Sequence, residues 1–136
     1  MQDLLLGQLQ ARKNRKNYAL VTIVDSFGST PRTSGKMLVY EGGLSKGTVG
    51  GGPHEQMAKQ DAVQCIRSGC NALKRYEIKS DGEVCTGGIS VFIEVFRVAP
   101  LLVVCGGGHV GRNLIPMAKM VGFDVLLVDT RAPEII

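Results

Sequence analysis

The sequence predicts a mixed α/β protein whose last part is a short Rossmann-like βαβ unit. Apolar, β-branched runs such as Tyr18–Val24 alternate with segments whose apolar residues recur at helical spacing. Glycine accounts for 18 of the 136 residues, well above its usual share of about 7%. These glycines lie mainly between the predicted elements, where turns and close backbone approaches require them.

The first part of the chain combines one helix with a set of strands. Asp3 can cap a helix whose apolar residues include Leu5 and Leu9. The elements expected here are a helix over 3–15, a buried strand over Tyr18–Val24, a turn over Asp25–Gly35, and strands over Lys36–Tyr40 and Leu44–Thr48 around a turn at Glu41–Gly43.

A second helix is expected in the middle of the chain. It begins after Pro53, which suits a first helical turn, and ends at Gly69. Strands over Leu73–Ile78 and Ile89–Val98 follow, and the stretch Ser80–Gly88 between them is predicted to be a loop.

Pro100 marks the expected boundary between a first domain, residues 1–99, and a second, residues 100–136. The second domain reads as one βαβ unit, because a glycine-rich loop follows a strand and opens a helix. Its elements are an apolar strand over Leu101–Cys105 that predicts cover on both sheet faces, a helix over 112–121, and a strand over Asp124–Val128. A single unit leaves strand edges unpaired. We therefore expect this domain to be incomplete, or completed by another chain in a homo-oligomer.

The composition of the chain limits the kinds of ligand and partner that it is expected to bind. The formal charge of +4 favours anions such as nucleotides and phosphorylated cofactors. Aromatic residues make up 5% and tryptophan is absent, which argues against a nucleic-acid stacking platform. No apolar run reaches the roughly 18 residues of a membrane span. Four cysteines without a C-x-x-C pair or a secretory signal predict a cytoplasmic protein without structural zinc.

The loop after the strand Leu101–Cys105 has the spacing Gly-x-Gly-x-x-Gly. Gly106 permits the tight turn, Gly108 the approach of a phosphate, and Gly111 the packing of helix on strand. Asp129 follows the last of these glycines by 18 positions and can accept a hydrogen bond from a ribose. His109 would lie beside a bound phosphate. The alternative is a Rossmann-type scaffold that binds nothing.

A second glycine-rich motif, GTVGGGPHE, lies between a strand and a helix. The consecutive glycines Gly50, Gly51 and Gly52 can form a concavity whose amides bind an anion, with Arg32 and Lys36 as complementary cations. A tight structural turn is the alternative, and Glu55 then serves to cap the helix.

Cys85 lies in the stretch predicted to be a loop. A cysteine flanked by flexible backbone is a candidate for reactivity or metal contact. The alternative is a small buried apolar residue.

Together these motifs resemble the XdhC/CoxI family, the accessory proteins of xanthine dehydrogenase and related molybdenum hydroxylases. The matching segments are GSTPR (Gly28–Arg32), GKMLV (Gly35–Val39), GTVGGGPHE (Gly47–Glu55), the segment from Cys85 to FIE (Phe92–Glu94), GGGHVGRNL (Gly106–Leu114) and VDTR (Val128–Arg131).

The resemblance implies an XdhC-type domain over 1–99 and an incomplete Rossmann-like domain over 100–136. It also implies a chaperone rather than a catalyst, which binds the molybdenum cofactor, assists its sulfuration and inserts it into a hydroxylase. The implied partners are that hydroxylase, a cysteine desulfurase and a second copy in a homodimer. The implied cofactor contacts are Arg32, Gly50, Gly51, Gly52 and Glu55, with Cys85 at the metal or its sulfur. The alternative function is an NAD(P)-binding oxidoreductase, or its subunit, that uses the loop Gly106–Gly111.

Overall fold

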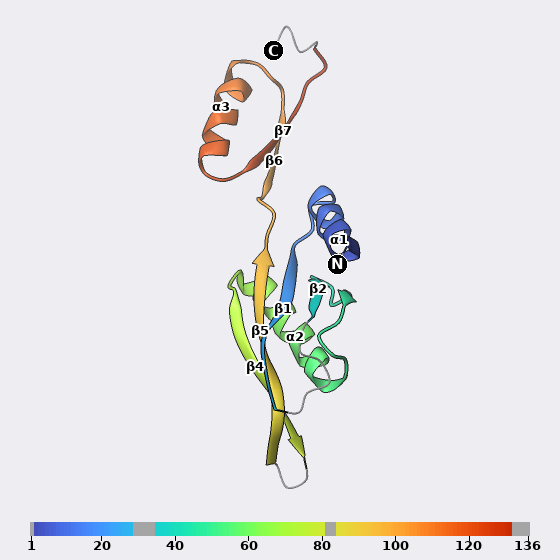
Figure 1. Cartoon of the computed structure of the whole chain (residues 1–136). Helices are drawn as coiled ribbons and strands as arrows, with labels where there is room; N and C mark the ends of the chain where they lie inside the picture. The colour runs from blue at the N-terminus through green and yellow to red at the C-terminus, as the bar shows by residue number, and fades with distance from the viewer. Residues whose placement is uncertain (1, 29–34, 81–83, 132–136) are drawn as a thin grey trace. The chain divides into compact units, whose positions relative to one another are not determined.

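The computed structural model describes residues 2–28, 35–80 and 84–131 (Figure 1). Its elements are α1 (Gln2–Lys13), β1 (Tyr18–Gly28), β2 (Lys36–Tyr40), β3 (Ser45–Gly47), α2 (Gly52–Ser68), β4 (Ala72–Ser80), β5 (Val84–Phe96), β6 (Leu101–Cys105), α3 (His109–Met120) and β7 (Asp124–Val128). The predicted mixed α/β class is confirmed. Among the described residues, no helix combines the length and apolarity that a bilayer crossing requires.

The chain divides into two compact units, Met1–Val98 and Ala99–Ile136. Each unit is described by itself. The identity of the domains expected over 1–99 and 100–136 stays a prediction.

The first unit is built on a five-stranded sheet with the order β3-β2-β1-β5-β4. Every neighbouring pair in this sheet is antiparallel. The central strand β1 places Tyr18 between Tyr40 of β2 and Phe96 of β5. Figure 1 shows β1, β5 and β4 running side by side.

Helix α2 covers one face of this sheet and forms the main core. Because successive residues of a strand point to opposite faces, alternate residues of each strand meet the helix. The buried members of this core are Ala19, Val21, Ile23, Met37, Val39, Val49, Ala58, Ala62, Cys65, Ile66, Tyr76, Ile89, Val91 and Ile93. Gly69 ends the helix in the left-handed conformation, as predicted.

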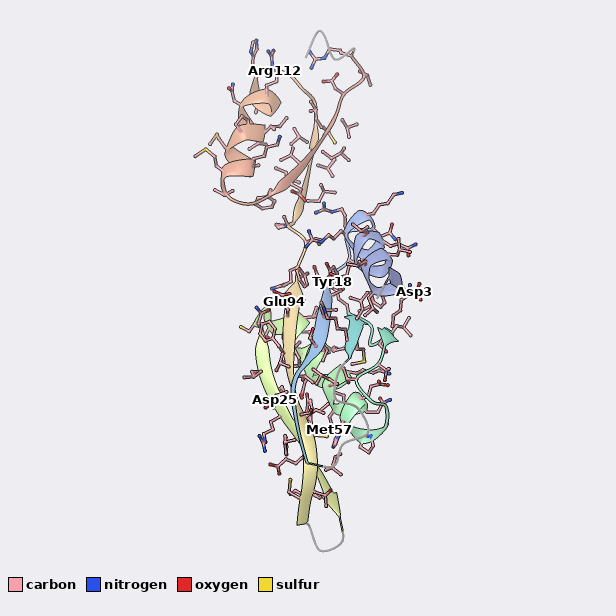
Figure 2. The ribbon with its side chains drawn as sticks, in the orientation of Figure 1. Asp3, Tyr18, Asp25, Met57, Glu94 and Arg112 are labelled. Carbon is pink, nitrogen blue, oxygen red and sulfur yellow. The ribbon has the colours of Figure 1, made fainter. Side chains whose placement is uncertain are left out.

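Helix α1 packs against the opposite face, at the β2 and β3 side. The buried residues of this smaller cluster are Leu4, Ala11, Tyr18 and Leu38. Tyr18 begins β1 beside α1 (Figure 2), and its ring stacks on Phe96 with centroids 4.9 Å apart. The sheet therefore has two separate cores, one under each helix.

Two predicted loops are partly strand. Asp25–Gly28, expected in a turn, continues β1 after an irregularity in register at Val24. Val84–Gly88, expected in a loop, belongs to β5 and pairs with the end of β4, again after a register shift. The residue types favour turns, but the long antiparallel pairing of β1, β5 and β4 overrides that local preference.

The second unit consists of β6 and β7, which pair in parallel, and α3. Helix α3 begins at His109, three residues earlier than predicted. The expectation that both faces of β6 are covered is wrong for the described residues, because Leu101 and Val103 are 44% and 48% exposed. Only one face of this two-stranded sheet is packed against α3.

Candidate functional site

The loop between β3 and α2 has an unusual backbone. Gly50, Gly51 and Gly52 have φ angles of 121°, 73° and 68°, a region that L side chains rarely adopt. Among the residues that the structure describes, none lies within 4 Å of a Cβ atom placed on Gly51 or Gly52. These glycines are therefore required by the conformation of the loop, and open space lies in front of two of them.

The carboxylate of Glu55 turns back into this loop. Its Oε1 accepts hydrogen bonds from the amides of Val49 at 3.1 Å and Gly51 at 3.3 Å. The hydroxyl of Thr48 donates to the same oxygen. The amide of Gly50 donates to the Thr48 hydroxyl oxygen at 3.0 Å. Three consecutive amides of the loop thus bind side chains of the chain itself.

These contacts change the acidity of Glu55. Burial disfavours its charged form and is the largest single effect, but the hydrogen bonds from Thr48, Val49 and Gly51 together with the charge of Lys59 outweigh it. The net effect lowers the pKa of Glu55. Lys59 Nζ lies 3.9 Å from Oε2, so the described part of the site pairs this carboxylate with a cation.

Of the two cations predicted for this loop, the structure describes Lys36 but not Arg32. Lys36 begins β2, and its main-chain carbonyl accepts a hydrogen bond from the Thr48 amide at 3.2 Å. Successive residues of a strand point to opposite faces of the sheet. The side chain of Lys36 therefore lies on the same face as Leu38, which α1 covers, and opposite to Met37. The backbone of Lys36 is therefore close to the loop, whereas its side chain belongs to the other face of the sheet.

A polar cluster beside this loop was not predicted. The hydroxyl of Tyr76 in β4 donates to the carboxylate of Asp61 in α2. Burial and this hydrogen bond raise the pKa of Tyr76 well above its ordinary value. The His54 ring stacks on Tyr76 at 6.3 Å, and its Nε2 donates to the carbonyl of Glu77 at 3.1 Å. His54 and Asp61 are seven residues apart and share one helix face, a spacing that could have indicated a common partner.

Cys85 lies in strand β5, opposite Lys79, rather than in the predicted loop. Its thiol donates to the carbonyl of Gly87 at 3.6 Å. Within the described ranges, no three His, Cys, Asp or Glu side chains come together in a way that could hold a metal ion. Contact of Cys85 with a metal or its sulfur stays a prediction.

The glycine loop of the second unit is tightly packed. A Cβ atom on Gly111 would lie 2.0 Å from the carbonyl oxygen of Gly106, so only glycine fits between helix and loop. In front of the loop is an open depression of about 660 Å³. Its lining includes Leu102, Val104, Gly106, Gly108, His109 and Leu114.

Asp129 is already paired at the end of β7. Its carboxylate accepts hydrogen bonds from the Gly107 amide at 2.6 Å and from Nη2 of Arg131 at 2.7 Å. The amide and Nε of Arg131 donate to the second oxygen at 2.8 and 3.0 Å. The hydrogen bonds from Arg131 and Gly107 hold the pKa of this carboxyl well below its usual range. A ribose hydroxyl would have to share these oxygens with Arg131.

Comparison with known proteins adds three findings. Residues 11–77 match the family model of the XdhC and CoxI family, the family that the motifs resemble. The "Uncharacterized protein YqeB" of Escherichia coli (strain K12) is 38% identical over 117 residues, which span 82% of this chain and 22% of that protein. The chain thus matches about a fifth of the length of this relative.

A crystal structure described as a xanthine dehydrogenase from Bacillus halodurans has a similar fold. The TM-score is 0.52 at 16% sequence identity, over 95% of this chain and 62% of that one. At this level of identity the likeness concerns the fold alone.

Proposed function

Because residues 11–77 belong to the XdhC and CoxI family, we propose that the chain is part of an accessory protein for molybdenum hydroxylases. In this proposal it binds the molybdenum cofactor and assists its sulfuration and its insertion into an enzyme of the xanthine dehydrogenase type. The observation that carries the proposal is the family match itself, since it spans the glycine loop and the start of α2.

The group to be recognised is a phosphorylated pterin dithiolene, which supplies the metal-binding sulfurs when bound. Open space in front of Gly51 and Gly52 and the N-terminus of α2 favour an anion at this loop. The amides of Val49, Gly50 and Gly51, however, already bind Glu55 and Thr48. In this conformation the loop does not fit an external phosphate through those three donors.

The proposed contacts follow from this geometry and from the family motifs. Gly51 and Gly52 border the open space, and Gly50 shapes the loop. Arg32 is proposed from the family motif as a cation for the phosphate, and Cys85 as the group that meets the metal or its sulfur. The side chain of Lys36, by contrast, lies on the opposite face of the sheet, and its carbonyl contacts the loop. We further propose a cytoplasmic homodimer whose partners are the hydroxylase and a cysteine desulfurase.

Cofactor content tests this function. The full chain, produced in a molybdate-fed host, is expected to carry pterin fluorescence and molybdenum in a fixed ratio. Gly51→Val places a β-branched side chain at a φ of 73° and is expected to lose both. Gly42→Val is the control, because Gly42 lies in an exposed turn and no described residue comes within 4 Å of its Cβ position. Cofactor-free wild-type protein, or retention by Gly51→Val, would contradict the proposal.

The depression in front of Gly106–Gly111 favours a second candidate, the binding of NAD(P) by an oxidoreductase or its subunit. It lies at the carboxyl end of β6, the position at which nucleotides bind in sheets of this type. Calorimetry with NADH and NADPH tests this candidate. Gly108→Val is the discriminating variant, because φ is −74° and, of the described residues, only Arg131 lies within 4 Å of the new Cβ. An affinity that this variant leaves unchanged would contradict the candidate.

A further inference from the structure

We propose that Glu55 is a latch on the glycine loop. Its carboxylate is the resident anion of the main-chain concavity at residues 48–51, and an external anion reaches these amides only after the carboxylate has left. The latch deepens the proposed function and rests on it for the identity of the anion, whereas its contacts are independent of that function.

The first argument is that the donors converge on one atom. Oε1 of Glu55 accepts from the Thr48 hydroxyl and from the amides of Val49 and Gly51. Hydrogen bonds to an ionised acceptor are about twice as strong as neutral ones. The Glu55 side chain is only 15% exposed, so water competes weakly for the same oxygen. A second anion at these amides would face a like charge at close range, which is unfavourable.

The second argument is that ordinary helix capping does not account for this contact. Gly51 is the N-cap of α2 and provides no side-chain hydrogen bond. A capping-box glutamate lies three residues after the N-cap and reaches its amide alone. Glu55 lies four residues after Gly51 and also binds the amide of Val49, beyond the end of the helix. It therefore fixes the loop itself as well as the first helical turn.

Third, the surroundings of Glu55 permit its carboxylate to leave the amides of the loop. Lys59 lies one helical turn further along α2, with Nζ 3.9 Å from Oε2, so a displaced carboxylate keeps a counter-ion. Thr48 also joins the latch to the loop, because it donates to Glu55 and accepts from the amide of Gly50. Departure of Glu55 therefore frees the amides of Val49 and Gly51 while Gly50 keeps its partner.

Amide exchange measured by NMR on the full chain tests the latch. In Glu55→Gln, exchange at Val49 and Gly51 is expected to accelerate about tenfold, while exchange at Gly50 changes less. Glu77→Gln is the matched control, since Glu77 is an exposed acid on β4 with its own ion pair to Arg75. Equal exchange at Val49 and Gly51 in the wild type and Glu55→Gln would overturn the proposal.

Inorganic phosphate provides the second measurement. It is expected to shift the amide signals of Val49 and Gly51 in Glu55→Gln and to leave them in place in the wild type at neutral pH. Equal shifts in both proteins, or none in either, would overturn the latch. If Glu55→Gln does not fold, a pH titration of the wild type tests the latch instead. The two amide signals must then titrate together with the Glu55 carboxyl carbon, and independent titration overturns the proposal.

The same variants separate the latch from the proposed function. Cofactor content reports on the function, and the amide signals report on the latch. Absence of pterin from both the wild type and Glu55→Gln, with the expected amide behaviour, would contradict the function and support the latch. If the protein carries the cofactor but the Val49 and Gly51 amides behave alike in the wild type and Glu55→Gln, the result would support the function and contradict the latch.

Discussion

The hydroxyl of Tyr76, on the edge strand β4, donates a hydrogen bond to the carboxylate of Asp61 in the middle of α2. His54, on the same face of the helix, stacks on the Tyr76 ring. This contact fixes α2 against the edge of the sheet, and with it the helix start that carries Glu55. The geometry of the glycine loop therefore depends on a residue that is 25 positions away in sequence from Gly51.

Tyr76→Phe is expected to destabilise the first unit by about 1–2 kcal/mol, because it leaves the Asp61 carboxylate without its buried donor. Urea denaturation should show a lower midpoint with an unchanged slope. The control is a double-mutant cycle with Asp61→Asn, in which the second change should add little. Fully additive effects would show that the two side chains do not interact.

The lowered pKa of Glu55 predicts a pH-dependent stability. The latch stabilises the fold fully above the ordinary glutamate pKa of about 4.5, and this contribution is lost as the pH falls through the lowered value. The charged group that faces this carboxylate is Lys59, whose Nζ lies 3.9 Å from Oε2. The free energy of unfolding of the wild type should exceed that of Glu55→Gln by about 1.5 kcal/mol at pH 7. This difference should vanish in acid. Unfolding in urea at several pH values measures it, and a constant difference would contradict the prediction.

Gly111→Ala is expected to disrupt the second unit. The new Cβ would lie 2.0 Å from the Gly106 carbonyl oxygen, so helix and loop must move apart at a cost of roughly 1–3 kcal/mol. The Gly106 amide, which donates to Val128 at 2.8 Å, should then exchange faster. Gly108→Ala is the control, because its nearest neighbour would be 3.9 Å away. Equal exchange of the Gly106 amide in Gly111→Ala and Gly108→Ala would show that Gly111 is not needed for the packing of helix on loop.

Arg131→Ala is expected to raise the pKa of Asp129 toward its ordinary value, because, among the described residues, Arg131 donates three of the four hydrogen bonds to this carboxylate. Removing the guanidinium takes away two of them and the adjacent positive charge. The carboxyl carbon signal of Asp129, followed against pH by NMR, measures the shift. Lys119→Ala removes a distant exposed charge from α3 and is the control. An unaltered titration would mean that the Gly107 amide dominates.

Much of the fold could be predicted from local patterns. The strands Lys36–Tyr40, Leu101–Cys105 and Asp124–Val128 were predicted with the observed bounds, because apolar runs between glycine-rich turns leave little choice of register. The segments Asp25–Gly28 and Val84–Gly88 were wrongly expected to be loops. Their pairing depends on strands far apart in the sequence, and local composition does not record it.

The candidate site was less predictable for the same reason. The three glycines were identified because positive φ angles demand this residue type. The alternative expectation gave Glu55 as a helix cap, but only the folded geometry shows that its carboxylate also binds the Val49 amide, beyond the start of the helix. Cys85 was singled out for a flexible loop backbone, whereas it lies in β5 and pairs with Lys79 of β4.

The absence of tryptophan makes the tyrosines natural optical probes of the first unit. Tyr18 lies in the cluster under α1 and Tyr76 in the one under α2, so ultraviolet emission reports on both sides of the sheet. Replacing Tyr76 by phenylalanine leaves Tyr18 and Tyr40, which lie in or against the cluster under α1, whereas replacing these two leaves Tyr76 alone under α2. Loosening of α1 can then be timed separately from loosening of α2.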